Sequence, residues 1–248
     1  MSQHTGGPVA RTGFWSAVLT ALLAAISFGV AVTTPPRSGP FAPPGSAIAY
    51  PYSGAARFVP RDFLWMYPAL LMMLAFLVLA ACLRERAAGE LRLFGTIGLC
   101  LAAISVGVIA VDYFIQLQTV QPGLLRGEGP ALAVVSQYNP HGIFITLENL
   151  GFLATSLSFA FLALTLGPSR AERAVRWVFL TCSALAVLAF VGMSAYFGFN
   201  LEYLFEVAVI SLVWLTLIVS GILLAFVFAR PADRISPETT RLRLGKKR

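Results

Sequence analysis

The stretch FLWMYPALLMMLAFLVLAACL at residues 63–83 contains no charged side chain and is followed directly by Arg84-Glu85-Arg86. An α-helix rises about 1.5 Å per residue, so about 20 apolar residues cross the hydrocarbon core of a bilayer, which is roughly 30 Å thick. The sequence therefore predicts an all-α, polytopic membrane protein with six transmembrane helices. The other five mainly apolar runs lie at residues 13–32, 94–117, 143–166, 177–199 and 204–229.

The first run, 13–32, has a second interpretation, as a signal peptide with a small-residue cleavage site at Gly29-Val30-Ala31. Its length exceeds the apolar segment of about 7–15 residues that signal peptides have, and Arg11 is the only charged residue before it. We therefore interpret it as a transmembrane helix. The chain then divides into an N-terminal tail at 1–12, one membrane domain at 13–229 and a basic C-terminal tail at 230–248.

The composition supports a membrane protein, since hydrophobic residues make up 58% of the chain and charged residues 12%, against about 25% charged residues in soluble domains. The net charge of +7 does not indicate nucleic-acid binding, because the charge is segregated. Of the 18 basic residues, 14 fall in the two tails and in the connections at 84–93 and 167–176. Connections rich in Lys and Arg stay cytoplasmic. We therefore predict three helical hairpins with both termini in the cytoplasm and the lipid bilayer as a partner.

Two long connections are predicted on the outer side, at about 33–62 and 118–142. The first is rich in proline and aromatic residues, which disfavours a helix and favours extended or polyproline backbone. It either packs as a lid over the helix ends or lies loosely among the lipid headgroups. In the second connection, Asn139-Pro140 has the pattern of a helix start, with Asn as the N-cap and Pro in the first turn.

Four acidic side chains lie in or near the predicted spans, all close to the outer boundary: Asp112, Glu148, Glu202 and Glu206. A charge in or near hydrocarbon is costly and suggests function. Glu202 and Glu206 also suit a plain structural role, because the helix dipole favours anions in the first turns of a helix. The dipole disfavours Asp112 near the end of its helix, so this residue needs a proton, outer water or a cationic partner. Candidate partners are Arg57, Arg61, Arg126, His141 and a bound cation.

We predict that these carboxyl groups form one outward-facing pocket for a cation or a small polar ligand. Imidazole and carboxylate groups bind metal ions or carry protons, and neighbouring amide side chains add hydrogen bonds; whether a metal binds stays open. The predicted ligand-binding residues are Asp112, Gln116, His141, Glu148, Asn149, Glu202 and Glu206.

The leading hypothesis from the sequence is a non-enzymatic binding protein without a cofactor. One alternative is a structural or accessory subunit that binds another membrane protein or further copies of itself. Another alternative is a membrane enzyme that uses His141 together with the carboxylates.

Several chemistries are excluded by what the sequence lacks. A single histidine at the outer face rules out a three-histidine hydrolase site, and HExxH, GxSxG and P-loop patterns are absent. The spans contain no lysine for a retinal Schiff base and no pair of histidines for a haem. Cys82, Cys100 and Cys182 lie toward the cytoplasmic half of the spans, so we expect from them neither an outer disulfide nor a metal site.

Three segments stand close together within about residues 110–155: DYFIQL at 112–117, QYNPHG at 137–142 and LENLG at 147–151. Together they resemble bacterial multi-pass membrane proteins to which no activity is assigned. The resemblance implies a location in the bacterial inner membrane, and it transfers no catalytic residue and no ligand to this chain.

Overall fold

The computed structural model describes residues 7–198 and 200–229, and within those residues it contains helices and loops but no strand. Six of the described helices are long and apolar enough to cross a membrane, as predicted. They are α1 Pro8–Val32, α2 Met66–Arg86, α3 Leu91–Ile115, α6 Ile143–Ala163, α7 Arg170–Phe197 and α8 Glu202–Ala229. The predicted basic tail at 230–248 lies outside the described residues. The grouping into hairpins and the orientation in a membrane stay predictions.

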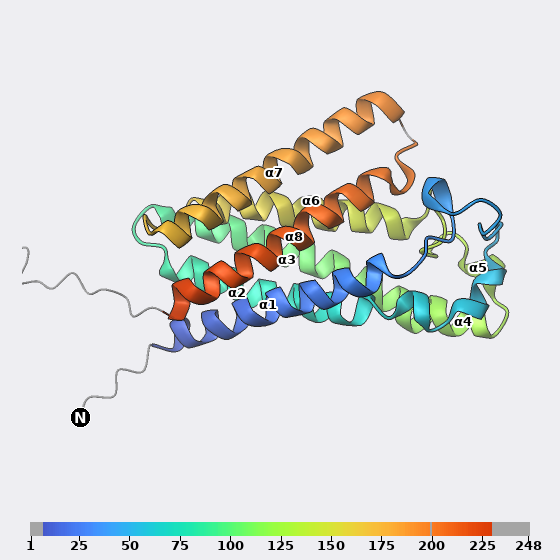
Figure 1. Cartoon of the computed structure of the whole chain (residues 1–248), viewed down its shortest axis with the longest axis horizontal. Helices are drawn as coiled ribbons and strands as arrows, with labels where there is room; N and C mark the ends of the chain where they lie inside the picture. Colours follow the sequence, from blue (N-terminus) through green and yellow to red (C-terminus); the bar gives the residue numbers. More distant parts are fainter. Residues whose placement is uncertain (1–6, 199, 230–248) are drawn as a thin grey trace, which may run out of the picture.

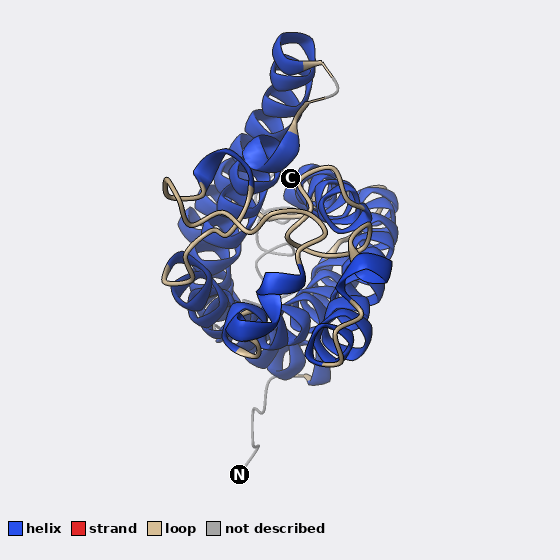
Figure 2. Cartoon of the chain, turned by 90° about the vertical axis from the view of Figure 1, so that its right-hand side faces the viewer, coloured by secondary structure: helices blue, strands red, loops and turns tan. Residues whose placement is uncertain are grey.

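Each long helix packs against the next one along the chain, and α1 packs along α8, which closes the bundle. Helix α7 is the exception to this close packing. In Figure 1 it leans away from α6 and α8 toward its C-terminal end, and in the end-on view of Figure 2 it projects from the ring formed by the other helices. The C-terminal half of α7 therefore has little protein around it.

The contacts of Arg86 show that three helix ends lie together at one end of the bundle. Its guanidinium pairs with Glu172 at 3.3 Å and lies 5.0 Å from the ring centre of Phe228. The end of α2, the start of α7 and the end of α8 therefore lie together, and we call this the arginine end. We call the opposite end the loop end (Figure 1). It carries the long connections with a π-helical turn at Gln116–Val120, α4 Gln121–Leu125 and α5 Gly129–Leu132.

Small residues let α3 and α6 approach closely, as is usual between helices in membranes. Ser105 Oγ donates to the Gly151 carbonyl over 2.7 Å. A Cβ atom at Gly151 would lie only 2.6 Å from the side chain of Ile109. This contact sets the rotation of both helices and brings Tyr113 of α3 to Glu148 of α6.

The connection at 33–62 is packed on the helix ends rather than loose, so the lid interpretation describes it. Ala55 and Phe63 are fully buried in this connection and its junction with α2. The prediction of extended backbone is wrong in part, because the connection contains three short 3-10 helices, the first of which has Pro40 in its first turn. These helices are Gly39–Phe41, Ser53–Phe58 and Arg61–Phe63.

The predicted helix start at Asn139 is also wrong. Helix α6 begins at Ile143, with Gly142 as its N-cap. The Asn139 side chain is used inside the loop, where its Oδ1 accepts from the His141 amide and its Nδ2 donates to the Ala133 carbonyl, each over 3.0 Å. Asn side chains stabilise such turns as readily as they cap helices, so the loop keeps the side chain and the helix begins later.

Candidate functional site

A buried hydrogen bond between α3 and α6 lies inside the loop end. Tyr113 Oη donates to Glu148 Oε1 over 2.7 Å, and both side chains have 0% exposure. The Tyr113 ring stacks on Phe144 with 6.2 Å between ring centres and meets Trp65 edge to face at 5.3 Å. These neighbours hold the hydroxyl on the carboxyl group, so the pair is a preformed element of the site.

Two further carboxyl groups lie beside this pair. Glu206 of α8, Glu148 of α6 and Asp112 of α3 lie near enough to one another for their charges to interact. One oxygen of each group is buried without a hydrogen-bond partner in the described residues. The described residues contain no group of three His, Cys, Asp or Glu side chains arranged to hold a metal ion.

Asp112 pairs with none of the cations that the sequence suggests for it. Arg126 Nε pairs with Glu128 at 2.9 Å, and Arg61 comes within 4.0 Å of Asp62 instead. Asp112 is almost fully buried, so outer water does not surround it either. A proton or a bound cation is what remains to neutralise this carboxyl group.

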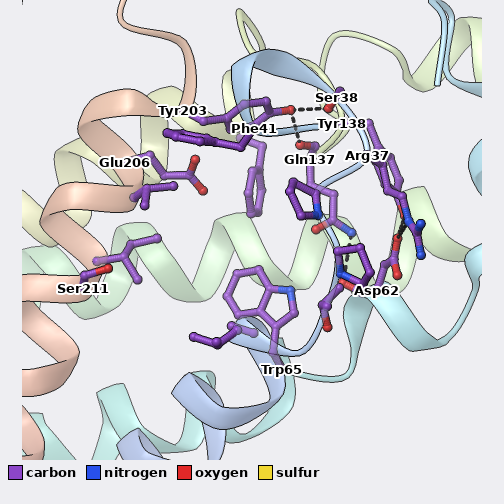
Figure 3. Close-up of a pocket in the computed structure, with 18 of the residues that line it drawn as sticks. Arg37, Ser38, Phe41, Asp62, Trp65, Gln137, Tyr138, Tyr203, Glu206 and Ser211 are labelled. Carbon is purple, nitrogen blue, oxygen red and sulfur yellow. Dashed lines mark hydrogen bonds and ion pairs between the residues drawn. The ribbon is translucent and has the colours of Figure 1, made fainter. Parts of the chain in front are cut away.

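A cavity of about 370 Å³ opens next to these carboxyl groups, between the end of α1, the start of α2 and the first half of α8. We call it the α1–α8 cavity. Figure 3 shows Glu206 directed into it, with the Tyr203 ring and the Trp65 indole on different sides of the same space. Its volume and its lining, which is rich in aromatic residues, are typical of small-molecule sites. The aromatic lining residues are Phe28, Phe41, Trp65, Tyr138, Phe144, Tyr203 and Trp214.

Three buried polar atoms of residues that line the α1–α8 cavity have no partner within the described ranges: Asp62 Oδ1, Glu206 Oε2 and Trp214 Nε1. Asp62 is 3% exposed and Trp214 is 1% exposed. Buried polar atoms are nearly always hydrogen-bonded, and an unpaired one costs roughly 1–3 kcal/mol. Two acceptors and one donor on residues that line the same cavity suit a ligand with matching groups.

An ion pair holds the first long connection over the cavity. Arg37 Nε lies 3.3 Å from Asp62 Oδ2, and the Arg37 guanidinium lies 3.7 Å from the ring centre of Phe58. Tyr138 Oη donates to the same Asp62 oxygen over 3.2 Å. Burial and the nearby Asp62 charge raise the pKa of Tyr138, so its hydroxyl stays protonated and keeps donating. Arg37 thus balances the charge of Asp62, whereas Glu206 has no cationic side chain within 4.0 Å in the described part of the chain.

Tyr203 and Gln116 fasten the second long connection. Tyr203 Oη lies 2.7 Å from Ser38 Oγ and donates to the Gln137 carbonyl over 2.9 Å. Gln116 Nε2 donates to the Val135 carbonyl over 2.6 Å, and its Oε1 accepts from the Gln137 amide over 3.0 Å. Gln116, predicted to bind the ligand, therefore supports the wall of the site through the backbone of a loop and is not among the residues that line the cavity.

Three other predicted residues line a second cavity, of about 400 Å³, which we call the α6–α7 cavity. His141 and Asn149 line it together with Glu202 at the start of α8 and Phe190 of α7. His141 is exposed and does not line the cavity into which Glu206 points. The seven predicted residues therefore do not form one pocket. Asp112, Glu148 and Glu206 come together, and His141, Asn149 and Glu202 lie at a different cavity.

The sequence analysis did not identify Asp62, Arg37 or the aromatic lining as parts of a site. Arg37 appears in the sequence only as one more charge in an outer loop. Aromatic residues such as Trp65 and Tyr203 near span ends are typical headgroup anchors, so they carry no separate signal. The one usable signal was Asp62 itself, an acidic residue directly before an apolar run and at the edge of a proline-rich loop.

No protein-family model, curated protein or solved structure matches this chain. The class of this protein is therefore described from its fold and its candidate site alone. It is an all-helical chain with six helices able to span a membrane in its described residues, and with two cavities at the loop end.

Proposed function

We propose that this chain is a non-enzymatic, multi-pass protein of the bacterial inner membrane that binds a cation or a small polar molecule in the α1–α8 cavity. In this proposal the six helices form three hairpins, both termini lie in the cytoplasm, and the cavity faces the outer side. The arginines gathered at the arginine end, such as Arg86, Arg92 and Arg176, support that orientation, because basic connections stay cytoplasmic.

The observation that carries this proposal is the set of unpaired polar atoms around one cavity. Asp62 Oδ1, Glu206 Oε2 and Trp214 Nε1 come from different parts of the chain, α8 and the junction before α2. All three residues line the same cavity, and a buried polar atom without a partner calls for one, which a ligand in the cavity supplies. The Arg37–Asp62 ion pair and the Tyr203 hydrogen bonds hold the walls in place without a ligand. A preformed site of this kind loses little entropy on binding.

Ligand binding is tested with the purified full chain in detergent by following its thermal unfolding midpoint. The panel contains inorganic cations, organic cations, zwitterions and neutral polar compounds. We expect at least one compound to raise the midpoint of the wild type, and the shift to disappear in Ser211→Trp, which fills the cavity. Glu128→Gln removes an exposed carboxylate at the loop end and should keep the shift. A panel without any shift, or a shift that survives Ser211→Trp, contradicts the proposal.

Access from the outer side is tested separately in intact cells. A cysteine is placed at Ser211 in the cavity, or at the exposed Ala88 in the α2–α3 turn, after Cys82, Cys100 and Cys182 have been replaced. A membrane-impermeant thiol reagent added outside should modify the cysteine at 211 and spare the one at 88. Modification of position 88 alone would show that the protein has the opposite orientation.

The accessory-subunit hypothesis keeps one supporting observation, the exposure of the outer half of α7. Leu188 is 66% exposed, Val191 59% and Tyr196 83%, and this part of α7 leans away from the bundle (Figure 1). A partner helix covering this face would be found by cross-linking a cysteine at Leu188 in membranes. A discrete cross-linked species supports the hypothesis, and reaction with lipid alone counts against it. The enzyme hypothesis is left with Glu202 as the carboxylate at the cavity of His141, because Asp112, Glu148 and Glu206 do not line that cavity.

A further inference from the structure

The chemical class of the ligand follows from the charge and the walls of the α1–α8 cavity, and this step rests on the proposed function. We infer that the cavity binds a small substituted ammonium cation, with the Glu206 carboxylate as its counter-charge and aromatic rings as its walls. The argument uses the charge balance of the lining, the arrangement of the rings and the donor that remains unpaired.

The charged residues that line the cavity are Arg37, Asp62 and Glu206. Arg37 and Asp62 pair with each other at 3.3 Å, and Arg37 is further engaged by the Phe58 ring. The carboxyl group of Glu206 is therefore the one lining group whose charge no side chain of the described residues balances. A buried charge without a partner is strongly disfavoured, so a cation in the cavity, in place of a proton on the carboxyl group, supplies what the site lacks.

The aromatic walls select an organic cation rather than a metal ion. Trp65 and Trp214 lie 5.9 Å apart with their planes tilted by 55°, and Phe28 meets Trp214 at 76°. These rings pack tilted or edge to face against one another in the wall, and Figure 3 shows the Tyr203 ring and the Trp65 indole on different sides of the space. Aromatic rings around a cavity attract alkylammonium groups through cation–π interactions. A hard metal ion prefers six or more oxygen ligands, and no three metal-binding side chains come together in the described ranges. A volume of about 370 Å³ also exceeds the needs of a bare ion.

The remaining unpaired donor adds a second feature to the ligand. Trp214, whose Nε1 is the unpaired donor, lies eight residues or about 12 Å further along α8 than Glu206, and Ser211 lies between them in sequence. An indole N–H donates only, so the ligand carries an oxygen acceptor toward this end. Both a free aminoalcohol and the headgroup of a choline lipid have this chemistry.

The test compares choline with 3,3-dimethylbutan-1-ol, its uncharged carbon analogue, on the wild-type chain in a choline-free detergent. Tetramethylammonium and sodium chloride at equal ionic strength are the other two probes. We expect choline and tetramethylammonium to bind, and the uncharged analogue to bind at least about tenfold more weakly. This comparison needs no variant, so it does not depend on whether a substitution folds. Equal binding of choline and its uncharged analogue overturns the inference.

Variants then locate the site. Glu206→Gln should weaken choline binding by at least about 30-fold, since a buried charge pair loses one partner. Phe41→Leu, at a half-exposed wall residue whose loss does not threaten folding, should weaken it about fivefold. Glu128→Gln should bind choline like the wild type. Unchanged binding in a folded Glu206→Gln protein, judged by its unfolding midpoint, overturns the inference.

The ammonium group could belong to a free molecule or to a lipid headgroup. Placing the protein in two different lipids distinguishes these two sources. In nanodiscs of phosphatidylglycerol, added choline should bind in either case. In nanodiscs of phosphatidylcholine, binding of added choline should persist if the ligand is a free molecule and should be blocked if the lipid headgroup occupies the site. A neutral polar compound that binds in place of every ammonium probe would leave the proposed function standing and remove this inference. Failure of every probe would remove both.

Discussion

Glu202 and Glu206 lie one turn apart on α8 and line different cavities. The α1–α8 cavity at Glu206 is walled by aromatic rings and covered by two connections that Arg37 and Tyr203 hold in place. The α6–α7 cavity at Glu202 borders α7 where this helix leans outward (Figure 2). Two carboxylates one turn apart on the same helix thus have different surroundings. The comparison teaches that the surroundings of an acidic residue depend on the connection packed over its helix end. The acidic residue type alone does not set them.

The largest effect should come from breaking the cover of the α1–α8 cavity with Arg37→Ala. The variant leaves Asp62 buried with only Arg61 near it, at 4.0 Å, so we expect a stability loss of roughly 3 kcal/mol. Reversible denaturant unfolding in detergent measures it. Arg57→Ala, at an exposed arginine of the same connection, should cost less than about 1 kcal/mol. Adding Asp62→Asn to Arg37→Ala should recover part of the lost stability. Equal stability losses for Arg37→Ala and Arg57→Ala would show that the Arg37–Asp62 ion pair does not stabilise the fold.

The next largest effect should come from Tyr113→Phe, which tests the buried hydrogen bond between Tyr113 and Glu148. Removing the hydroxyl leaves Glu148 Oε1 without its donor, so stability should fall by about 2 kcal/mol. Tyr196→Phe, at a tyrosine that is 83% exposed on α7, should change stability by less than about 0.5 kcal/mol. The same unfolding measurement applies to both variants, and a neutral Tyr113→Phe would argue that a proton on Glu148 replaces the lost donor.

A smaller effect is expected from Gln116→Leu, which detaches the second connection from α3. Two hydrogen bonds to the loop backbone are lost, at Val135 and Gln137, for a cost of about 1–2 kcal/mol. Gln118→Leu changes an exposed glutamine in the same turn and should be close to neutral. Native-state hydrogen exchange should show faster exchange of the loop amides around Gln137 in Gln116→Leu. Unchanged exchange there would mean that Tyr203 alone holds the connection.

The smallest effect should be that of Glu202→Gln at the α6–α7 cavity. Its stability change should stay within about 0.5 kcal/mol, because the carboxyl group has no ion pair among the described residues. Glu202→Gln should bind choline like the wild type, whereas Glu206→Gln is expected to lose choline binding. Loss of choline binding in both variants would show that the two cavities act as one site, as the single pocket predicted from the sequence requires.

The six helices and their approximate ends were predictable from the sequence alone. The reason is that crossing a bilayer is a requirement of length and composition, which can be counted along the chain. The run at 63–83 and the helix α2 Met66–Arg86 differ by only a few residues at either end. The position of Asp112, Glu148 and Glu206 near one end of their helices followed in the same way, from their distance to the ends of the runs.

Only the tertiary structure decided which side each of these residues faces. The helices are apolar on nearly every face, so the sequence carries no periodic signal for their rotation, which packing sets through contacts such as Gly151 against Ile109. The partner of Asp62 was equally hidden, because Arg37 lies 25 residues away in a loop whose path depends on the helices beneath it. Composition and run length determined that this chain is a membrane protein with carboxyl groups near one end. Helix rotation and loop packing decided that Glu206, and not Glu202, faces an aromatic cavity.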